Sequence, residues 1–206
     1  MFKEVSLGKM WSMEFLRIRL KDDVVEKLNQ EADVWLEKNI DYSHTLAGEI
    51  KKGKQSKIEF PDWFDVREPV SRYLRRQFFT KDKELENLHM VESWIVSQFA
   101  GDYNPVHAHG SDISAIVYLK VPPQIKQSFD SIGKNGQPCL DGCIHFILGN
   151  YHEPSLQNFG PRIILPEVGD MYIFPGYIQH TVYPFKGDGE RRCIAFNMDL
   201  RNKYGR

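Results

Sequence analysis

The sequence predicts an α+β fold that is mainly β, in which short strands form a sandwich or barrel and helices pack on one outer face. Three observations predict it. Helical spacing of apolar residues is confined to the first half of the 206-residue chain, short β-rich runs fill the second half, and no internal repeat is present. A chain of this length is expected to form a single domain over 1–206, with a mixed, partly helical part at 1–87 and a β core at 88–200.

The first half predicts one strand and two helices. Apolar residues alternate with arginines over 16–20, as in a half-buried strand. Asp22 or Asp23 then caps a helix with apolar residues at helical spacing. These residues are Val24, Val25, Leu28, Ala32, Trp35 and Leu36. A second helix is expected over 66–79, and the Gly- and Lys-rich segment 41–58 indicates a mobile loop.

From Leu88 onward, runs rich in β-branched and aromatic residues alternate with Gly, Pro, Asn and Asp. The candidate strands are 89–99, 113–121, 142–148, 162–165, 170–174, 179–184 and 191–199. Two long connections, 41–60 and 122–140, are candidates for a lid or a recognition surface, although plain flexible connection is the commoner role of such loops.

Composition excludes several classes of protein. Lys and Arg number 27 against 28 Asp and Glu, a net charge of −1 that gives no electrostatic argument for nucleic-acid binding. Cys139, Cys143 and Cys193 are too few for a disulfide framework or a four-cysteine zinc site. Residues 1–11 lack an apolar h-region and no run has the length of a membrane span. We therefore expect a soluble cytoplasmic protein without a signal peptide, as a monomer or a homodimer.

Three histidines in the β half have the order and context of a metal site. His107 and His109 are one residue apart, so in an extended chain their side chains point to the same side. His180 follows 71 residues after His109, behind a Pro-Gly turn at 175–176 that aims the next strand back toward the barrel. Neutral imidazole is a good ligand for iron, zinc, copper or nickel. A His-x-His pair alone is a weak pattern, but together with His180 it predicts a metal site. The other histidines, His44, His89, His145 and His152, lack this spacing and are expected to be structural.

The last strand, 191–199, has two unlike faces. Arg191 shares one face with smaller and more polar residues, while Arg192 shares the other with large apolar residues. The two sets are Arg191, Cys193, Ala195 and Asn197, and Arg192, Ile194, Phe196 and Met198. Because the smaller, more polar face should line a ligand cavity, we favour Arg191 as the ligand-binding arginine and expect Arg192 to be a surface or rim charge.

These motifs resemble the 2-oxoglutarate/iron(II)-dependent oxygenase superfamily, especially its bacterial and phage-type and prolyl-hydroxylase-like members. The resemblance covers roughly half the chain, from about Trp94 to Asn197. The matching stretches are "NPVHAHGSDISAIVYLKVP", "GDMYIFPGYIQHTVYP" and "GERRCIAFNMD". It implies a double-stranded β-helix (a jelly roll, cupin-like), Fe(II) and 2-oxoglutarate (2OG) as cofactors, and hydroxylation of a small-molecule or peptide substrate with release of succinate and CO2.

The resemblance also implies roles for single residues. His107 and His180 resemble iron ligands, and Arg191 and Tyr118 resemble the pair that holds the remote carboxylate of 2OG. Asn197, on the same face as Arg191, joins them as a candidate cofactor-binding residue. No catalytic side chain beyond the metal ligands is implied.

The sequence departs from the superfamily at the third ligand. The usual motif is His-x-Asp or His-x-Glu, whereas this chain has His109 at the acidic position. The site is therefore either a three-histidine site or one in which Asp112 supplies the carboxylate. We favour His109 because it has the right spacing and shares a face with His107. Three neutral imidazoles leave the metal its full charge, which should attract dianionic 2OG, and they leave zinc or nickel as other candidate metals.

Two other functions fit parts of the pattern. A cupin-type metal enzyme or binding protein that does not use 2OG would fit the spacing from Gly169 to His180, but it would leave Arg191 and Tyr118 without a shared ligand. A non-enzymatic β-sandwich with a structural metal would require a closed, four-ligand site.

Overall fold

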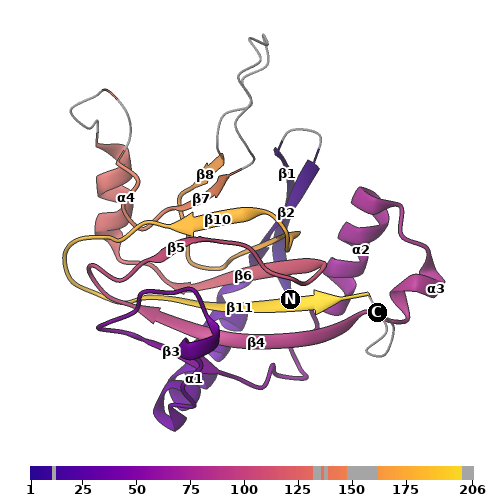
Figure 1. Cartoon of the computed structure of the whole chain (residues 1–206), viewed down its shortest axis with the longest axis horizontal. Helices are drawn as coiled ribbons and strands as arrows, with labels where there is room; N and C mark the ends of the chain where they lie inside the picture. Colours follow the sequence, from indigo (N-terminus) through magenta and orange to yellow (C-terminus); the bar gives the residue numbers. More distant parts are fainter. Residues whose placement is uncertain (11–12, 132–135, 137–138, 148–161, 201–206) are drawn as a thin grey trace.

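The strands of the computed structural model form two sheets. The structure describes residues 1–10, 13–131, 136, 139–147 and 162–200. Its strands are β1 (Phe2–Met10), β2 (Met13–Leu20), β3 (Lys54–Lys57), β4 (His89–Gln98), β5 (Asn104–His107), β6 (Ile113–Lys120), β7 (Ile144–Ile147), β8 (Arg162–Ile164), β9 (Asp170–Pro175), β10 (Gln179–Val182) and β11 (Arg191–Asp199). The larger sheet has the order β1-β2-β9-β6-β11-β4-β3 and the smaller has the order β5-β10-β7-β8 (Figure 1). The fold is the predicted jelly roll with open sheets. That the chain is one domain over 1–206 stays a prediction.

The helices are α1 (Asp22–Lys38), α2 (Arg67–Phe78), α3 (Asp82–Leu85), α4 (Pro123–Asp130) and a single 3-10 turn, η1 (Ser43–Thr45). The two long helices match the prediction, whereas α3 and α4 were not predicted. The cap of α1 differs from the expectation: Lys21 is the N-cap, and both Asp22 and Asp23 lie in the first turn. Their negative charges are favourable there because the helix dipole is positive at its N-terminus.

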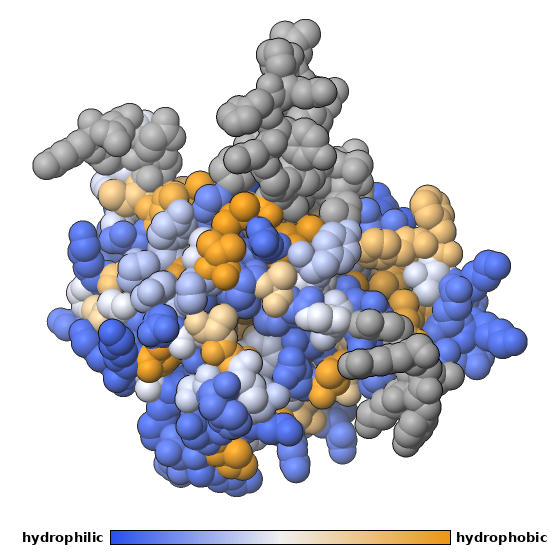
Figure 2. All heavy atoms as spheres, viewed as in Figure 1, coloured by the Kyte–Doolittle hydropathy of each residue, from blue (hydrophilic) through white to orange (hydrophobic). Residues whose placement is uncertain are grey.

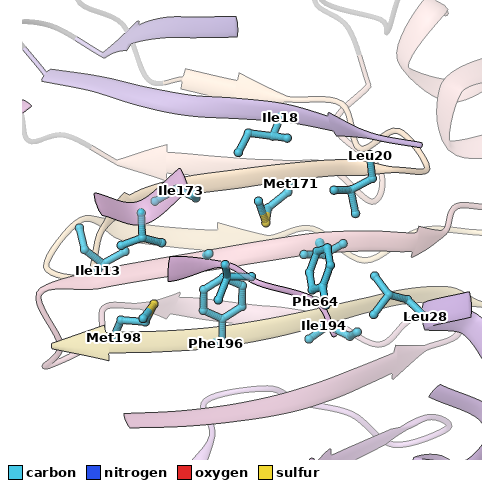
Figure 3. Packing of buried hydrophobic residues seen from close by; sticks show 14 of the residues in the cluster. Ile18, Leu20, Leu28, Phe64, Ile113, Met171, Ile173, Ile194, Phe196 and Met198 are labelled. Carbon is cyan, nitrogen blue, oxygen red and sulfur yellow. The ribbon is translucent and has the colours of Figure 1, made fainter. Parts of the chain in front are cut away.

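One hydrophobic core lies between the larger sheet and the helices. It joins apolar residues of β2, β6, β9 and β11 to residues of α1 and α2 (Figure 3). Members labelled in Figure 3 are Ile18, Leu20, Leu28, Phe64, Ile113, Met171, Ile173, Ile194, Phe196 and Met198. The large apolar face predicted for the last strand therefore packs against the helices, as does the apolar face predicted for 16–20. Helices thus cover one outer face of the larger sheet, as the sequence predicted.

A second core fills the space between the two sheets. The larger sheet contributes Trp94, Val96 and Tyr118 among others, and the smaller sheet contributes Ile144 and Phe146. Because the sheets face each other across this core, polar side chains on their inner faces are brought together from distant parts of the chain. The candidate site lies within this layer.

Segment 41–58, predicted to be a mobile loop, is largely fixed to the larger sheet. It contains η1 and β3, and β3 pairs with β4 as an edge strand. Two isolated bridges, Asp41–Ser56 and Glu49–Tyr103, hold the rest. The lysines that suggested mobility are exposed, which is the usual protection of an edge strand, and Figure 2 shows a mainly hydrophilic surface where α1 and β3 lie.

Asp102 ties this segment to the turn after β4. Its carboxylate accepts backbone N–H bonds from Lys51 at 2.9 Å, Lys52 at 3.1 Å, Gly53 at 2.9 Å and Phe99 at 3.0 Å. Burial opposes ionisation, but the four donors outweigh it, so the pKa of Asp102 lies below its ordinary 3.8. The ionised carboxylate therefore stabilises the fold.

We expect Asp102→Asn to lower the free energy of unfolding at neutral pH by about 1.5–3 kcal/mol, because bonds from N–H groups to a charged acceptor are lost. The stabilisation is present above 3.8 and is lost as pH falls through the lower folded-state pKa. Denaturant unfolding of wild type and Asp102→Asn, at neutral pH and at a pH below 3.8, measures this stabilisation as the difference in the free energy of unfolding. The exposed Asp130, which pairs with Lys126, gives the control variant Asp130→Asn. An equal difference between wild type and Asp102→Asn at both pH values would contradict the expectation.

Among the described residues, no helix combines the length and apolarity that crossing a bilayer requires.

Candidate functional site

His107, His109 and His180 meet at one end of the inter-sheet layer. His107 ends β5 and lies opposite His180 on the paired strand β10. One ring nitrogen from each residue lies within 4.8 Å of the others. The ring centroids are 4.3 Å apart for His107 and His180, 5.2 Å for His107 and His109, and 5.3 Å for His109 and His180. The fold therefore brings the three predicted ligands together.

Two of these rings are oriented by backbone carbonyls. Nδ1 of His107 lies 2.7 Å from the oxygen of Pro105, and Nδ1 of His180 lies 3.0 Å from the oxygen of Ile178. A carbonyl only accepts, so each Nδ1 carries the proton and each Nε2 keeps its lone pair. This is the arrangement that fixes the tautomer of metal-binding histidines.

Burial keeps the imidazoles neutral. It lowers the pKa of His180 to about 3, with the neighbouring His107 adding to the effect, and it lowers the pKa of His109 to about 4 in the same way. Burial also lowers the pKa of His107, partly offset by its bond to Pro105. Neutral imidazole is the form that binds a metal ion.

The other candidate ligand, Asp112, is not part of the cluster that the three histidines form among the described residues. Its carboxylate accepts a hydrogen bond from the backbone of Leu200 at 2.9 Å, and its own N–H donates to Asp199 at 2.7 Å. Backbone hydrogen bonds join this loop to the Pro-Gly turn. The N–H of His109 donates to the backbone oxygen of Gly176 at 2.9 Å, and the N–H of Gly176 donates to the backbone oxygen of Asp112 at 3.0 Å. A side chain at Gly176 would lie 2.1 Å from the oxygen of Ser111, so only glycine fits.

Asn197 lies at the histidine end of the site. Its amide nitrogen is 3.4 Å from Nδ1 of His109 and donates to Glu92 at 2.7 Å, while its oxygen accepts from Ser114 at 2.5 Å. These three polar residues are cross-strand neighbours on β4, β11 and β6. Sequence reasoning missed Glu92 and Ser114. Period-two alternation along 89–99 would have placed Glu92 on the same face as Trp94.

Arg191 lies in the same pocket as the histidines. Its side chain is among the largest fully buried ones, at 1% exposure. The guanidinium donates to Gln98 Oε1 and, at 3.4 Å, to the hydroxyl of Tyr118, above whose ring it lies at 5.1 Å from the centroid. No carboxylate pairs with Arg191 among the described residues, and its Nε has no hydrogen-bond partner there. A buried guanidinium without a carboxylate partner is unusual, because no opposite charge compensates the free-energy cost of removing it from water.

Arg192 is not the surface or rim charge that the sequence predicted. It is 4% exposed and pairs with Glu190 at 2.7 Å and with Asp33 of α1 at 2.7 Å. The strand alternation does send it to the helix side, but α1 covers that side and supplies a carboxylate. The two adjacent arginines therefore differ in charge compensation rather than in burial.

A single pocket connects the three histidines to Arg191. Apolar side chains from both sheets line it between the two polar ends, among them Trp94, Ile144, Phe174 and Val182. Cys193, Ala195 and Asn197 line it with Arg191, as the alternation on the last strand predicted. His145 lies on β7 outside this set, and His152 lies outside the described residues.

Comparison with known families decides the identity. A family model described as "Putative 2OG-Fe(II) oxygenase" matches residues 92–197, just over half of the chain. The chain belongs to this family. The oxygenase family uses Fe(II) and 2OG, and the matched segment runs from Glu92 to Asn197, so it contains all three histidines, Tyr118 and Arg191. No curated protein sequence matches the chain.

Solved structures share the fold of this oxygenase at low identity. A prolyl-4-hydroxylase from Pseudomonas putida is 14% identical, with a TM-score of 0.59, over 96% of this chain and 93% of that one. A viral collagen prolyl hydroxylase from Paramecium Bursaria Chlorella virus-1, in complex with 2OG, is 16% identical, with a TM-score of 0.56, over 93% and 96%. HygX from Streptomyces hygroscopicus, with nickel and 2OG bound, is 14% identical, with a TM-score of 0.53, over 90% and 82%.

Proposed function

We propose that this oxygenase hydroxylates a small-molecule or peptide substrate, with His107, His109 and His180 as its iron ligands. Arg191 and Tyr118 are proposed to hold the remote carboxylate of 2OG. The observation that carries this proposal is the buried guanidinium of Arg191, which pairs with no carboxylate of the described residues and lines the same pocket as three converging imidazoles.

The residues present fit both groups. Neutral imidazoles suit iron(II), and two of the three have a fixed proton on the nitrogen that faces away from the cluster. The Arg191 guanidinium, whose Nε has no hydrogen-bond partner among the described residues, suits a carboxylate, because a planar fork can bind one bidentately. An anion there would compensate the buried charge.

The chain's own residues orient and protect the reaction. Burial raises the pKa of Tyr118 far above its ordinary value, so its hydroxyl stays protonated and would donate to a 2OG carboxylate bound beside Arg191. Trp94 and Phe174 exclude water from the space between the two polar ends. Iron and 2OG, when bound, would let dioxygen oxidise an unreactive C–H bond: one oxygen atom would enter the hydroxyl group of the product, and the other would enter succinate as 2OG loses CO2.

Asn197 is proposed to position the ring of His109 rather than to bind 2OG, since its amide nitrogen lies 3.4 Å from Nδ1 of that ring. The solved neighbours include a viral collagen prolyl hydroxylase and HygX with hygromycin B bound, so we propose a peptide or a small molecule as the substrate. A monomer or a homodimer remains our expectation.

The third ligand is tested by the visible charge-transfer band of the anaerobic iron–2OG complex. We expect wild type and Asp112→Asn to show the band, because asparagine keeps the acceptor for Leu200. We expect His109→Ala to lose it or to bind iron much more weakly. The opposite pattern, with the band lost in Asp112→Asn and kept in His109→Ala, would make Asp112 the ligand. Absence of the band in wild type would refute the proposed function itself.

A further inference from the structure

Gln98 accepts a hydrogen bond from the guanidinium of Arg191. It is the last residue of β4, is 1% exposed, and lies directly across from Arg191 in the β4–β11 register. Its Oε1 accepts from Nη1 of Arg191, and its Nε2 donates to Oδ1 of Asn104 at 2.8 Å. Both ends of the Gln98 amide are therefore occupied, and the amide can present only its oxygen to the guanidinium.

The neutrality of Gln98 decides the charge of the pocket. A carboxylate at this position would pair with Arg191 and neutralise it, as Glu190 does for the neighbouring Arg192. The amide offers an acceptor of nearly the same shape without the charge. Gln98 therefore holds the Arg191 guanidinium without neutralising it, and no carboxylate among the described residues supplies the countercharge.

The bond from Gln98 also reaches the strands that carry the histidines. Asn104 is the first residue of β5, which ends at His107. The backbone oxygen of Asn104 accepts from the hydroxyl of Thr181 at 2.7 Å, next to His180 on β10. Hydrogen bonds thus link Arg191 to Gln98, Gln98 to the Asn104 side chain, and the Asn104 backbone to Thr181.

We propose that Gln98 is a positioning residue for 2OG: it holds the Arg191 guanidinium toward the pocket and leaves its charge uncompensated for the remote carboxylate of the cofactor. This inference rests on the proposed function of the site. It assigns to Gln98 a role in cofactor affinity and separates that role from metal binding, since the side-chain hydrogen bonds of Gln98 within the described part of the chain go to Arg191 and Asn104 and not to a histidine.

The test is Gln98→Glu, measured by anaerobic calorimetry of 2OG binding to nickel-loaded protein, with nickel affinity and thermal unfolding measured separately. The substitution keeps the size of the side chain, and the Asn104 amide can rotate to donate to the new carboxylate. We expect 2OG affinity to fall at least about 30-fold, as for loss of a buried charge partner. Nickel affinity should stay within a few fold of wild type. The Tm of the ligand-free protein should be equal or higher, because a buried unpaired charge becomes paired.

The matched control is Gln55→Glu on the adjacent strand β3. Gln55 is 3% exposed and its amide atoms have no hydrogen-bond partner among the described residues. The same chemical change should lower the Tm there, because the new carboxylate has no partner, and should leave 2OG affinity unchanged. A purely structural role for Gln98 predicts this control pattern for both variants.

A second variant, Gln98→Met, removes the acceptor without adding charge. We expect 2OG affinity about 3- to 10-fold below wild type, consistent with loss of one hydrogen bond that orients the arginine. The inference is overturned if Gln98→Glu binds 2OG as tightly as wild type, or if nickel affinity falls in parallel. If Gln98→Glu does not fold, unchanged 2OG affinity in Gln98→Met overturns it. Wild type that binds nickel but not 2OG refutes the proposed function instead.

Discussion

His180→Ala is expected to lower metal affinity by more than about 100-fold and to abolish 2OG turnover, since loss of even an outer-shell partner of a metal ligand typically costs about 10- to 100-fold. The reason is geometric. His180 is the most buried of the three histidines, its Nδ1 is tied to Ile178 at 3.0 Å, and its Nε2 is left for the metal. Nickel binding by calorimetry, followed by succinate release with iron, measures both effects.

His145→Ala is the matched control for this variant. His145 lies on β7, the strand paired with β10, and stacks on Tyr183 with Nδ1 3.1 Å from its hydroxyl. It is half-buried but does not line the pocket, so its removal should leave nickel affinity unchanged. A His180→Ala protein that binds nickel like wild type would remove His180 from the ligand set.

Arg191→Met is expected to weaken 2OG binding by about 2–5 kcal/mol, which is roughly 30- to several thousand-fold. Methionine fills much of the same volume but offers neither charge nor fork to the carboxylate. Tyr118→Phe should have a smaller effect, about 0.5–1.5 kcal/mol, because it removes one hydrogen bond. Calorimetry of 2OG binding to the nickel-loaded protein measures both variants.

Arg192→Met separates cofactor binding from general damage to the strand. Arg192 is buried like Arg191 but has acidic partners in Glu190 and Asp33. Its removal leaves those carboxylates without their arginine, so it should lower the free energy of unfolding and leave 2OG affinity unchanged. If Arg192→Met binds 2OG more weakly than Arg191→Met, the arginine that holds the 2OG carboxylate is Arg192, and the proposed role of Arg191 is wrong.

The parts of the fold that the sequence predicted are those with a local cause. Alternation over 16–20 and 191–199 follows from the geometry of a strand, and helical spacing in 22–38 follows from the geometry of a helix. Both predictions hold because one face of each element is buried. Segment 41–58 was predicted wrongly, since its lysines describe only the exposed side of an edge strand and not its pairing with β4.

In the candidate site, too, the features that the sequence predicted are those with a local cause. Sequence by itself determined that His107 and His109 share a side, that His180 follows a Pro-Gly turn, and that Arg191 faces away from Ile194 and Phe196. These statements concern neighbours along the chain, where covalent geometry fixes the direction of each side chain. The sequence left the choice between His109 and Asp112 open, because a turn of a few residues can direct an aspartate to either side.

Only the tertiary structure decided which distant groups meet. It turned Asp112 toward Leu200, placed Glu92 and Asn197 beside His109, and gave Arg192 a carboxylate from α1 while leaving Arg191 with the neutral Gln98. Gln98 and Arg191 are 93 positions apart, and no local pattern links them. Strand pairing sets such contacts, and with them the charge and orientation of the groups that face the pocket.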